Sequence, residues 1–185
     1  MKVIVISASP NLDGLTAACA SAAIEGARDA GADGVEVRLT DSGIGMCEQC
    51  ENGWGTCLKE HHCQVEDGFQ ALHARVVAAD GLVLVTPVYW GEMSESAKAF
   101  TDRLRRCEAT RGDESGLAGK PVLAIAAAGG SGGGMITCLA SMERWMQHVR
   151  ARTWDLIPVN RWSGAYKIEA IRAAARVMVD DAVHS

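Results

Sequence analysis

The chain has 185 residues, of which 48% are apolar and 22% are charged, as is ordinary for one globular domain with a sizeable core. Its formal net charge of −5 argues against a nucleic-acid partner, which requires a basic face. The amino-terminal apolar run is too short for a secretory signal, and no run approaches the ~18 residues that cross a bilayer. We therefore expect a cytoplasmic protein without a membrane partner.

Apolar strands alternate with helices along the chain. Residues 3–6 form a continuous β-branched run, which is typical of a strand buried on both faces of a parallel sheet. The predicted strands are residues 3–6, 35–39, 81–86, 122–127 and 153–158, and the predicted helices are residues 15–30, 67–79, 94–107, 135–150 and 169–182, with Ser94 as a helix cap. Because crossovers between parallel strands are right-handed, this order predicts an α/β fold: a doubly wound five-stranded parallel sheet with helices on both faces, in one domain spanning 1–185.

A cysteine-rich loop at about 41–66 interrupts this alternation. It has no sustained periodicity, and loops of this length within a compact domain are usually functional. The thiolates of cysteine are the usual ligands of [4Fe–4S] clusters and of structural zinc. The candidate metal ligands are Cys47, Cys50, Cys57 and Cys63, and His61 and His62 are further candidates for zinc. The alternative without metal is a loop with reduced thiols or a redox-labile disulfide.

The other cysteines fall within predicted helices: Cys19, Cys107 and Cys138. A reducing compartment disfavours structural disulfides. We therefore expect each of these residues to be a small buried apolar side chain.

The turn after the first strand carries hydroxyl groups at the point where a helix begins. Hydroxyls, together with free amides at a helix amino terminus, bind phosphate well. The candidate cofactor-binding residues in this turn are Ser7, Ser9, Asn11, Gly14, Leu15 and Thr16. Helix capping and turn formation alone favour the same residue types, so a purely structural role stays open.

Two further strand ends have the composition of a ligand site. Backbone amides and aromatic rings at a strand terminus suit the edge of a flat heterocycle, and glycines allow a close approach. The candidate residues are Pro87, Val88, Tyr89, Trp90 and Gly91 after one strand, and Gly129, Gly130 and Ser131 after the next. A hydrophobic plug and a flexible linker are the respective structural alternatives. Because the carboxyl ends of parallel strands meet at one edge, one flat anionic ligand would account for all three turns.

The motifs P-V-Y-W-G at 87–91, K-A-F-T-D-R at 98–103 and the two strand-end turns resemble the NAD(P)H-dependent FMN reductase family over about residues 1–150. The cysteine loop makes the chain look most similar to the iron–sulfur flavoprotein branch. The resemblance implies a flavodoxin-like fold, bound FMN, NAD(P)H as co-substrate, and a homodimer or homotetramer whose subunits complete the flavin site. It also implies that Lys98, Asp102 and Arg103 fix a helix and a subunit contact.

Carried over by position, Ser9, Asn11 and Thr16 would hold the FMN phosphate, with Ser7 close by. Residues 87–91 and 129–131 would contact the isoalloxazine and ribityl parts. The iron–sulfur flavoproteins have a tighter C-x2-C-x2-C motif followed by a fourth cysteine. Here six residues separate Cys50 from Cys57, and Gly53 and Gly55 would have to let the loop fold back.

The resemblance implies an oxidoreductase that passes electrons from NAD(P)H to a small-molecule or protein acceptor, through FMN and a [4Fe–4S] cluster. Hydride transfer to flavin requires no general acid or base, so we predict no catalytic side chain. One alternative is a flavodoxin-type electron carrier without NAD(P)H activity of its own. Another is a zinc-stabilised binding module in which the glycine turns are structural.

Overall fold

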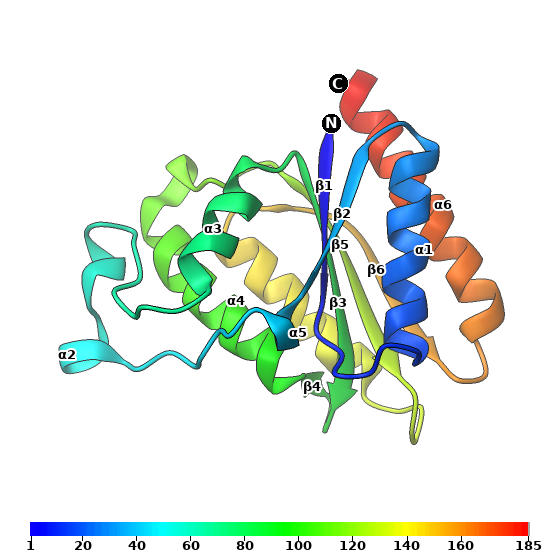
Figure 1. Cartoon of the computed structure of the whole chain (residues 1–185), viewed down its shortest axis with the longest axis horizontal. Coiled ribbons are helices and arrows are strands. Elements are labelled where there is room, and N and C mark those ends of the chain that lie inside the picture. Colours follow the sequence, from blue (N-terminus) through cyan, green and yellow to red (C-terminus); the bar gives the residue numbers. More distant parts are fainter. Residues whose placement is uncertain (185) are drawn as a thin grey trace.

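A central sheet runs through the computed structural model, which describes residues 1–184. The long strands are β1 (Lys2–Ser7), β2 (Asp33–Arg38), β3 (Gly81–Tyr89), β5 (Pro121–Ala128) and β6 (Arg152–Asn160). They lie in the order β2-β1-β3-β5-β6, and every neighbouring pair is parallel (Figure 1). Each of the predicted strands is present, and the predicted α/β fold is confirmed.

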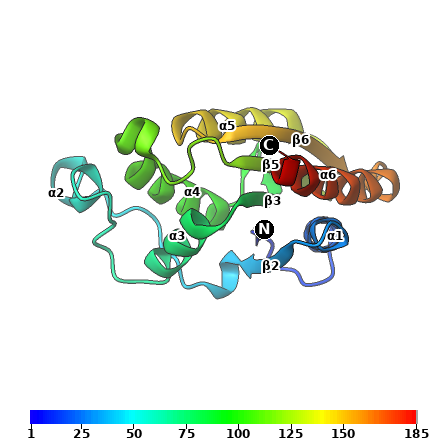
Figure 2. The same cartoon turned by 90° about the horizontal axis from the view of Figure 1, so that it is seen from above.

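Helices cover both faces of this sheet, as predicted (Figure 2). The helices on one face are α1 (Leu15–Asp29) and α6 (Gly164–His184), and those on the other are α3 (Phe69–Ala78), α4 (Glu95–Glu108) and α5 (Met135–His148). Side chains alternate between the two layers, so that in β1 Val3 and Val5 pack towards α1, whereas Ile4 and Ile6 pack towards α3 and α4. Burial on both faces explains why the central strands β1, β3 and β5 read as continuous apolar runs.

The structure adds a short antiparallel strand that the sequence analysis did not predict. Strand β4 (Glu92–Met93) pairs with the end of β3. It is too short to show a period of its own in the sequence. The last helix also begins at Gly164 rather than at residue 169, because Asn160 accepts the backbone amides of Trp162 and Ser163 and turns the chain directly into the helix.

The strand order reverses direction between β1 and β3, with β2 on one side and β5 and β6 on the other. Ligands of doubly wound sheets bind at such a switch point, outside the carboxyl ends of the strands. These ends lie along the lower edge of the molecule in Figure 1. The cysteine-rich segment leaves the end of β2 and extends past α3 and α4, with the short helical turn α2 (Cys50–Gly53) at its far end.

A buried carboxylate ties α3 and α4 to the chain that precedes β5. Glu108 is 1% exposed, and its Oε1 lies 2.6 Å from Nε2 of His73. Its Oε2 accepts hydrogen bonds from Oγ of Ser115 at 3.0 Å and from the backbone amide of Gly116 at 2.6 Å. Burial alone would raise the pKa of Glu108, but the hydrogen bond from His73 and those from Gly116 and Ser115 hold this pKa below its usual value.

We predict that Glu108→Gln lowers the free energy of unfolding by about 1–3 kcal/mol at neutral pH, because buried partners lose part of their hydrogen bonding. The folded-state pKa of Glu108 is depressed, so its contribution is complete above the unfolded pKa of about 4.3 and is lost as the pH falls towards the folded pKa. In urea unfolding experiments between pH 7 and 3, the free energy of unfolding should therefore fall more steeply with decreasing pH in the wild type than in the variant. Glu36→Gln, at an exposed position on β2, is the control, and parallel curves for wild type and Glu108→Gln would contradict the prediction.

Candidate functional site

The turn between β1 and α1 presents an uncapped helix amino terminus. Gly14 is the residue at the cap position, and no side chain caps α1 there. Ser7, Ser9 and Thr16 are nearly fully buried around this turn, and Oγ of Ser9 accepts the amide of Asn11 at 3.1 Å. Unpaired amides at the positive end of a helix dipole, beside hydroxyls, form a favourable site for an anion.

A cation reaches this turn from the neighbouring strand, and the sequence analysis missed it. Arg38 pairs in register with Ser7, and its Nη2 donates to the carbonyl oxygen of Pro10 at 3.4 Å. Its Nη1 lies 3.4 Å from a carboxylate oxygen of Asp41. The available signal was the position of Arg38 at the end of the strand that neighbours β1 in the parallel order.

The end of β3 turns sharply through two residues with positive φ. Trp90 has φ 53° and Gly91 has φ 82°, and β4 returns antiparallel to β3 immediately afterwards. This conformation is that of a two-residue hairpin turn, which favours glycine. The side chain of Trp90 is fully exposed rather than packed over the sheet as a plug.

The glycine turn after β5 is in contact with this hairpin. Oγ1 of Thr137 donates to the carbonyl oxygen of Gly91 at 2.8 Å, and a Cβ on Gly134 would lie 2.8 Å from Cα of Gly91. By contrast, a Cβ on Gly129 or Gly130 would meet nothing within 4 Å. The backbone at these two residues is therefore open to the approach of a ligand.

An aromatic residue that the sequence analysis missed, Trp162, borders the glycine turn. Trp162, between β6 and α6, lies so close that a Cβ on Gly132 would be 2.4 Å from its ring, yet Trp162 is 67% exposed. Its place directly after the last predicted strand was the signal that could have found it.

Hydrogen bonds lock the ends of β1 and β3 together. The amide of Ala8 donates to the carbonyl oxygen of Val85 at 2.9 Å, and Oγ of Ser94 donates to the carbonyl oxygen of Ala8 at 3.3 Å. Oγ1 of Thr86 accepts the amide of Ser94 at 3.0 Å. Ser94 also accepts the amide of Ala97 and caps α4, as predicted. The edge at the switch point is thus held in one arrangement.

The four clustered cysteines line one small cavity of about 20 Å³. They are Cys47, Cys50, Cys57 and Cys63, and Arg103 and Arg106 of α4 line the same cavity. Within residues 1–184, no three histidine, cysteine or acidic side chains lie close enough to hold a single metal ion. Thiolates are ligands of [4Fe–4S] clusters and of structural zinc, so the donor chemistry of the four cysteines fits either metal centre.

Arg103 anchors the cysteine-rich segment. It is 1% exposed, and its Nη2 lies 3.3 Å from Sγ of Cys63 and 3.0 Å from Oδ1 of Asp67. Its Nη1 donates to the carbonyl oxygen of Gly45 at 3.1 Å. The expected subunit contact through Arg103 is therefore wrong, because this side chain is buried within its own chain. Burial alone would raise the pKa of Asp67, but hydrogen bonds from Arg103, Gly45 and Phe69 hold it below its usual value.

Arg106 supports the far end of the same segment. Its Nη1 donates to the carbonyl oxygen of Gly53 at 2.6 Å, and its guanidinium lies over the ring of Trp54, 4.7 Å from the centroid. The expectation that Lys98 and Asp102 fix the helix agrees with their ion pair on α4, one turn apart. Helix α4 thus connects the strand ends to the cysteines.

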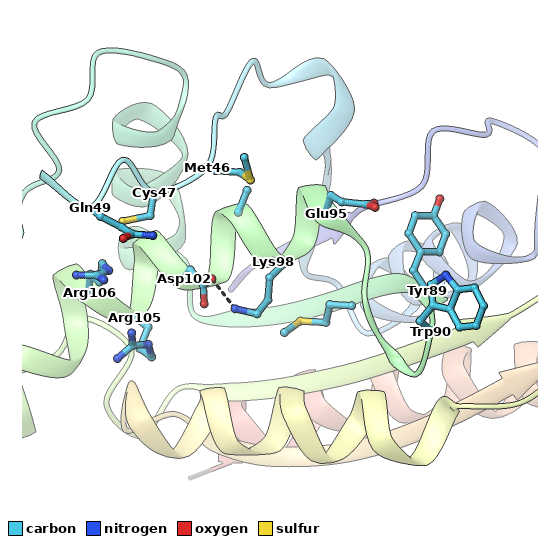
Figure 3. Close-up of a pocket in the computed structure, with 12 residues that line it drawn as sticks. Met46, Cys47, Gln49, Tyr89, Trp90, Glu95, Lys98, Asp102, Arg105 and Arg106 are labelled. Atoms are coloured by element: carbon cyan, nitrogen blue, oxygen red, sulfur yellow. Dashed lines mark hydrogen bonds and ion pairs between the residues drawn. The ribbon is translucent and has the colours of Figure 1, made fainter. Parts of the chain in front are cut away.

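A groove of about 590 Å³ runs between the β3–β4 hairpin and the cysteine-rich segment (Figure 3). Tyr89 and Trp90 lie side by side at one end, and Cys47 and Gln49 lie towards the other. Lys98 lies in the middle of the groove. Because Cys47 lines both this groove and the cysteine cavity, the two spaces adjoin.

The three scattered cysteines are fully buried, as predicted: Cys19, Cys107 and Cys138. Burial raises the pKa of each thiol to about 12. These residues therefore remain protonated and behave as apolar core side chains.

The model of the NADPH-dependent FMN reductase family matches residues 1–156. The chain belongs to this family. An iron–sulfur flavoprotein of Methanosarcina thermophila is 28% identical over 79% of this chain and 73% of its own length. An iron–sulfur flavoprotein of Methanocaldococcus jannaschii is 29% identical over 77% of this chain and 69% of its own length. The resemblance inferred from the motifs is confirmed.

Several solved structures share the fold of this chain. One is a flavodoxin from the domain Archaea, with a TM-score of 0.67, 15% identity and 100% of both chains covered. A flavone reductase has a TM-score of 0.74 and 17% identity, with 99% of this chain and 63% of the other covered. At these identities the likeness shows the fold alone. Within residues 1–184, no helix has the length and apolarity needed to cross a membrane.

Proposed function

We propose that this FMN reductase family member passes electrons from NAD(P)H through bound FMN to a second acceptor, with a [4Fe–4S] cluster among the four cysteines as the outlet. The observation that carries the proposal is the continuity between the two sites. One groove leads from Tyr89 and Trp90 at the strand ends to Cys47, and Cys47 also lines the cysteine cavity. The acceptor is a small molecule or a protein.

The residues at the strand ends fit FMN. The uncapped amino terminus of α1, with Ser9 and Thr16, would receive the terminal phosphate, and Arg38 would add a positive charge nearby. Residues 87–91 and 129–131 would border the ring system, where Gly129 and Gly130 leave the backbone open. A single helix terminus suits one phosphate, which favours FMN over a dinucleotide.

Bound FMN would supply hydride uptake and stepwise electron release. The side chains at the strand ends would bind and orient this cofactor. Tyr89 and Trp90 would lie beside its exposed side, where a nicotinamide must stack over the face of the ring for hydride transfer. None of these roles requires a side chain that moves a proton.

The four cysteines would hold the cluster, and α4 would hold the cysteines. The shared cavity and the arginine anchors support this assignment, as does the similarity of the chain to two iron–sulfur flavoproteins. An iron–sulfur cluster accepts single electrons, so it would provide an outlet beside the flavin.

A second copy of the chain would cover the apolar edge. Leu12, Trp90 and Trp162 are exposed at the turns that border the proposed flavin site. Large apolar side chains gathered at one edge are typical of an interaction surface. We infer a homodimer or homotetramer in which these turns meet a neighbouring subunit, in the cytoplasm.

The NAD(P)H step distinguishes a reductase from a flavodoxin-type carrier. We expect anaerobic mixing with NADPH or NADH to bleach the flavin absorbance of the purified protein in a stopped-flow experiment. A carrier would be bleached by dithionite yet remain oxidised in excess of either nucleotide. Protein without any flavin band after incubation with FMN would instead favour a binding module.

Thr16→Val tests the phosphate site. The substitution keeps the shape of the side chain and removes one hydrogen-bond donor, so FMN binding should weaken by roughly 1–3 kcal/mol. Thr153→Val, at the opposite end of the sheet in β6, is the matched control. Titration calorimetry of the apoproteins measures the FMN affinity of the wild type and of both variants. Equal affinity of wild type and Thr16→Val would remove Thr16 from the site.

Cys57→Ser tests the cluster. Anaerobically prepared wild type should contain about four irons per chain and absorb broadly beyond the flavin bands. The variant should lose the iron and keep FMN, because the phosphate turn lies at another strand end. Cys19→Ala, a buried cysteine on the other face of the sheet, should keep both. Iron-free wild type would leave the flavin assignment intact and eliminate the cluster.

A further inference from the structure

Arg103 is a buried cation at the wall of the cysteine cavity. It lines the cavity together with all four clustered cysteines, and it is 1% exposed. Its Nη2 lies 3.3 Å from Sγ of Cys63, within hydrogen-bonding distance of sulfur. The charge of Arg103 is paired with Asp67, so its hydrogen bond to sulfur, which is little screened by solvent at a buried position, is its most direct action on the cysteine.

One nitrogen of this guanidinium, Nε, has no hydrogen-bond partner within residues 1–184. Asp67 accepts from both Nη1 and Nη2, and the carbonyl oxygens of Gly45 and Val65 take further bonds. The ring of Phe69 covers one face, 4.4 Å from the guanidinium carbon. Among the residues that the structure describes, Nε of Arg103 is the single buried side-chain nitrogen or oxygen without a partner.

Leaving a buried hydrogen-bond donor unpaired is unfavourable, so Nε of Arg103 calls for an acceptor. Arg103 borders the space lined by the four thiols, and the contact of Nη2 with Sγ of Cys63 at hydrogen-bonding distance already directs this side chain to sulfur, so a second sulfur of a metal centre is an acceptor that suits Nε. Hydrogen bonds to the sulfurs are among the features that set the reduction potential of an iron–sulfur cluster.

We propose that Arg103 is a positioning residue for the metal centre: it donates to Sγ of Cys63 through Nη2 and to a further sulfur through Nε, and it thereby raises the reduction potential. This inference rests on the proposed iron–sulfur function. A positive charge and its hydrogen bonds stabilise the reduced centre, which carries one more negative charge, over the oxidised one.

Arg106 provides a matched comparison on the same helix. It lies one turn further along α4 and lines the same cavity. Its contacts, however, are with the carbonyl oxygen of Gly53 and the ring of Trp54. Arg103 and Arg106 therefore share the role of loop anchor, whereas the side-chain hydrogen bond to a cysteine sulfur belongs to Arg103 among the described residues.

The experiment compares Arg103→Lys with Arg106→Lys in the full chain, reconstituted anaerobically with iron, sulfide and FMN. Lysine keeps the charge beside Asp67 but lacks Nε and the planar fork. A redox titration followed by electron paramagnetic resonance gives the potential of the cluster. For Arg103→Lys we expect the ratio of reduced to oxidised cluster at a fixed potential to fall about tenfold, or ~59 mV for a one-electron couple. For Arg106→Lys we expect a change below about twofold.

Iron and flavin contents sharpen the interpretation. Arg103→Lys protein that keeps FMN but loses iron, while Arg106→Lys keeps both, would also support the proposal. Equal iron loss in both variants would overturn it, because loop anchoring would then explain the effect. A potential unchanged from wild type in iron-loaded Arg103→Lys would overturn it as well.

Should Arg103→Lys fail to fold, Arg103→Gln combined with Asp67→Asn removes both charges of the buried pair together. The double variant should show the same fall in the ratio of reduced to oxidised cluster, and a wild-type potential in it would overturn the proposal. Wild type that binds FMN but no iron would overturn the cluster and this inference together. If the proposal for Arg103 alone is wrong, the wild type still holds its cluster, and this result distinguishes it from a failure of the proposed function.

Discussion

Parallel hydrogen bonding between β1, β3 and β5 aligns three loops that are far apart in the sequence, and the site depends on this alignment. In a parallel sheet every strand ends at the same edge, so the helix amino terminus after β1, the hairpin after β3 and the glycine turn after β5 become neighbours. The bonds of Ser94 to Ala8 and Thr86 then hold the first two ends together. A ligand at this edge would meet a surface that is already organised.

Helix α4 couples this edge to the cysteines. It starts at the capping residue Ser94, inside the hydrogen-bond network of the strand ends, and it carries Arg103 and Arg106 into the cysteine-rich segment. A helix transmits position over its whole length because its backbone bonds are internal. The segment itself has almost no regular structure, so its arrangement is imposed by the helix. Within the K-A-F-T-D-R motif, Arg103 contacts the cysteine-rich segment, whereas Lys98 and Asp102 line the groove beside Tyr89 and Trp90.

Much of the fold was predictable because burial on both faces leaves a strong signal. The β-branched run in β1 and the alternating layers of β3 and β5 read directly as parallel strands. Strand β4 escaped prediction because two residues carry no period. The role of Arg103 was also misjudged, because the family resemblance implied a subunit contact, whereas Arg103 is buried against Cys63 and Asp67 of its own chain.

The sequence by itself determined the layer architecture, the residue types at each strand end and the presence of four thiols in one loop. These properties are local: they follow from periodicity, turn chemistry and composition. The tertiary structure decided which groups meet. It brought Arg38 beside the first turn, Trp162 against Gly132, and Arg103 against Cys63. Contacts of this kind join separate elements, so they depend on strand order and helix packing, which no local pattern encodes.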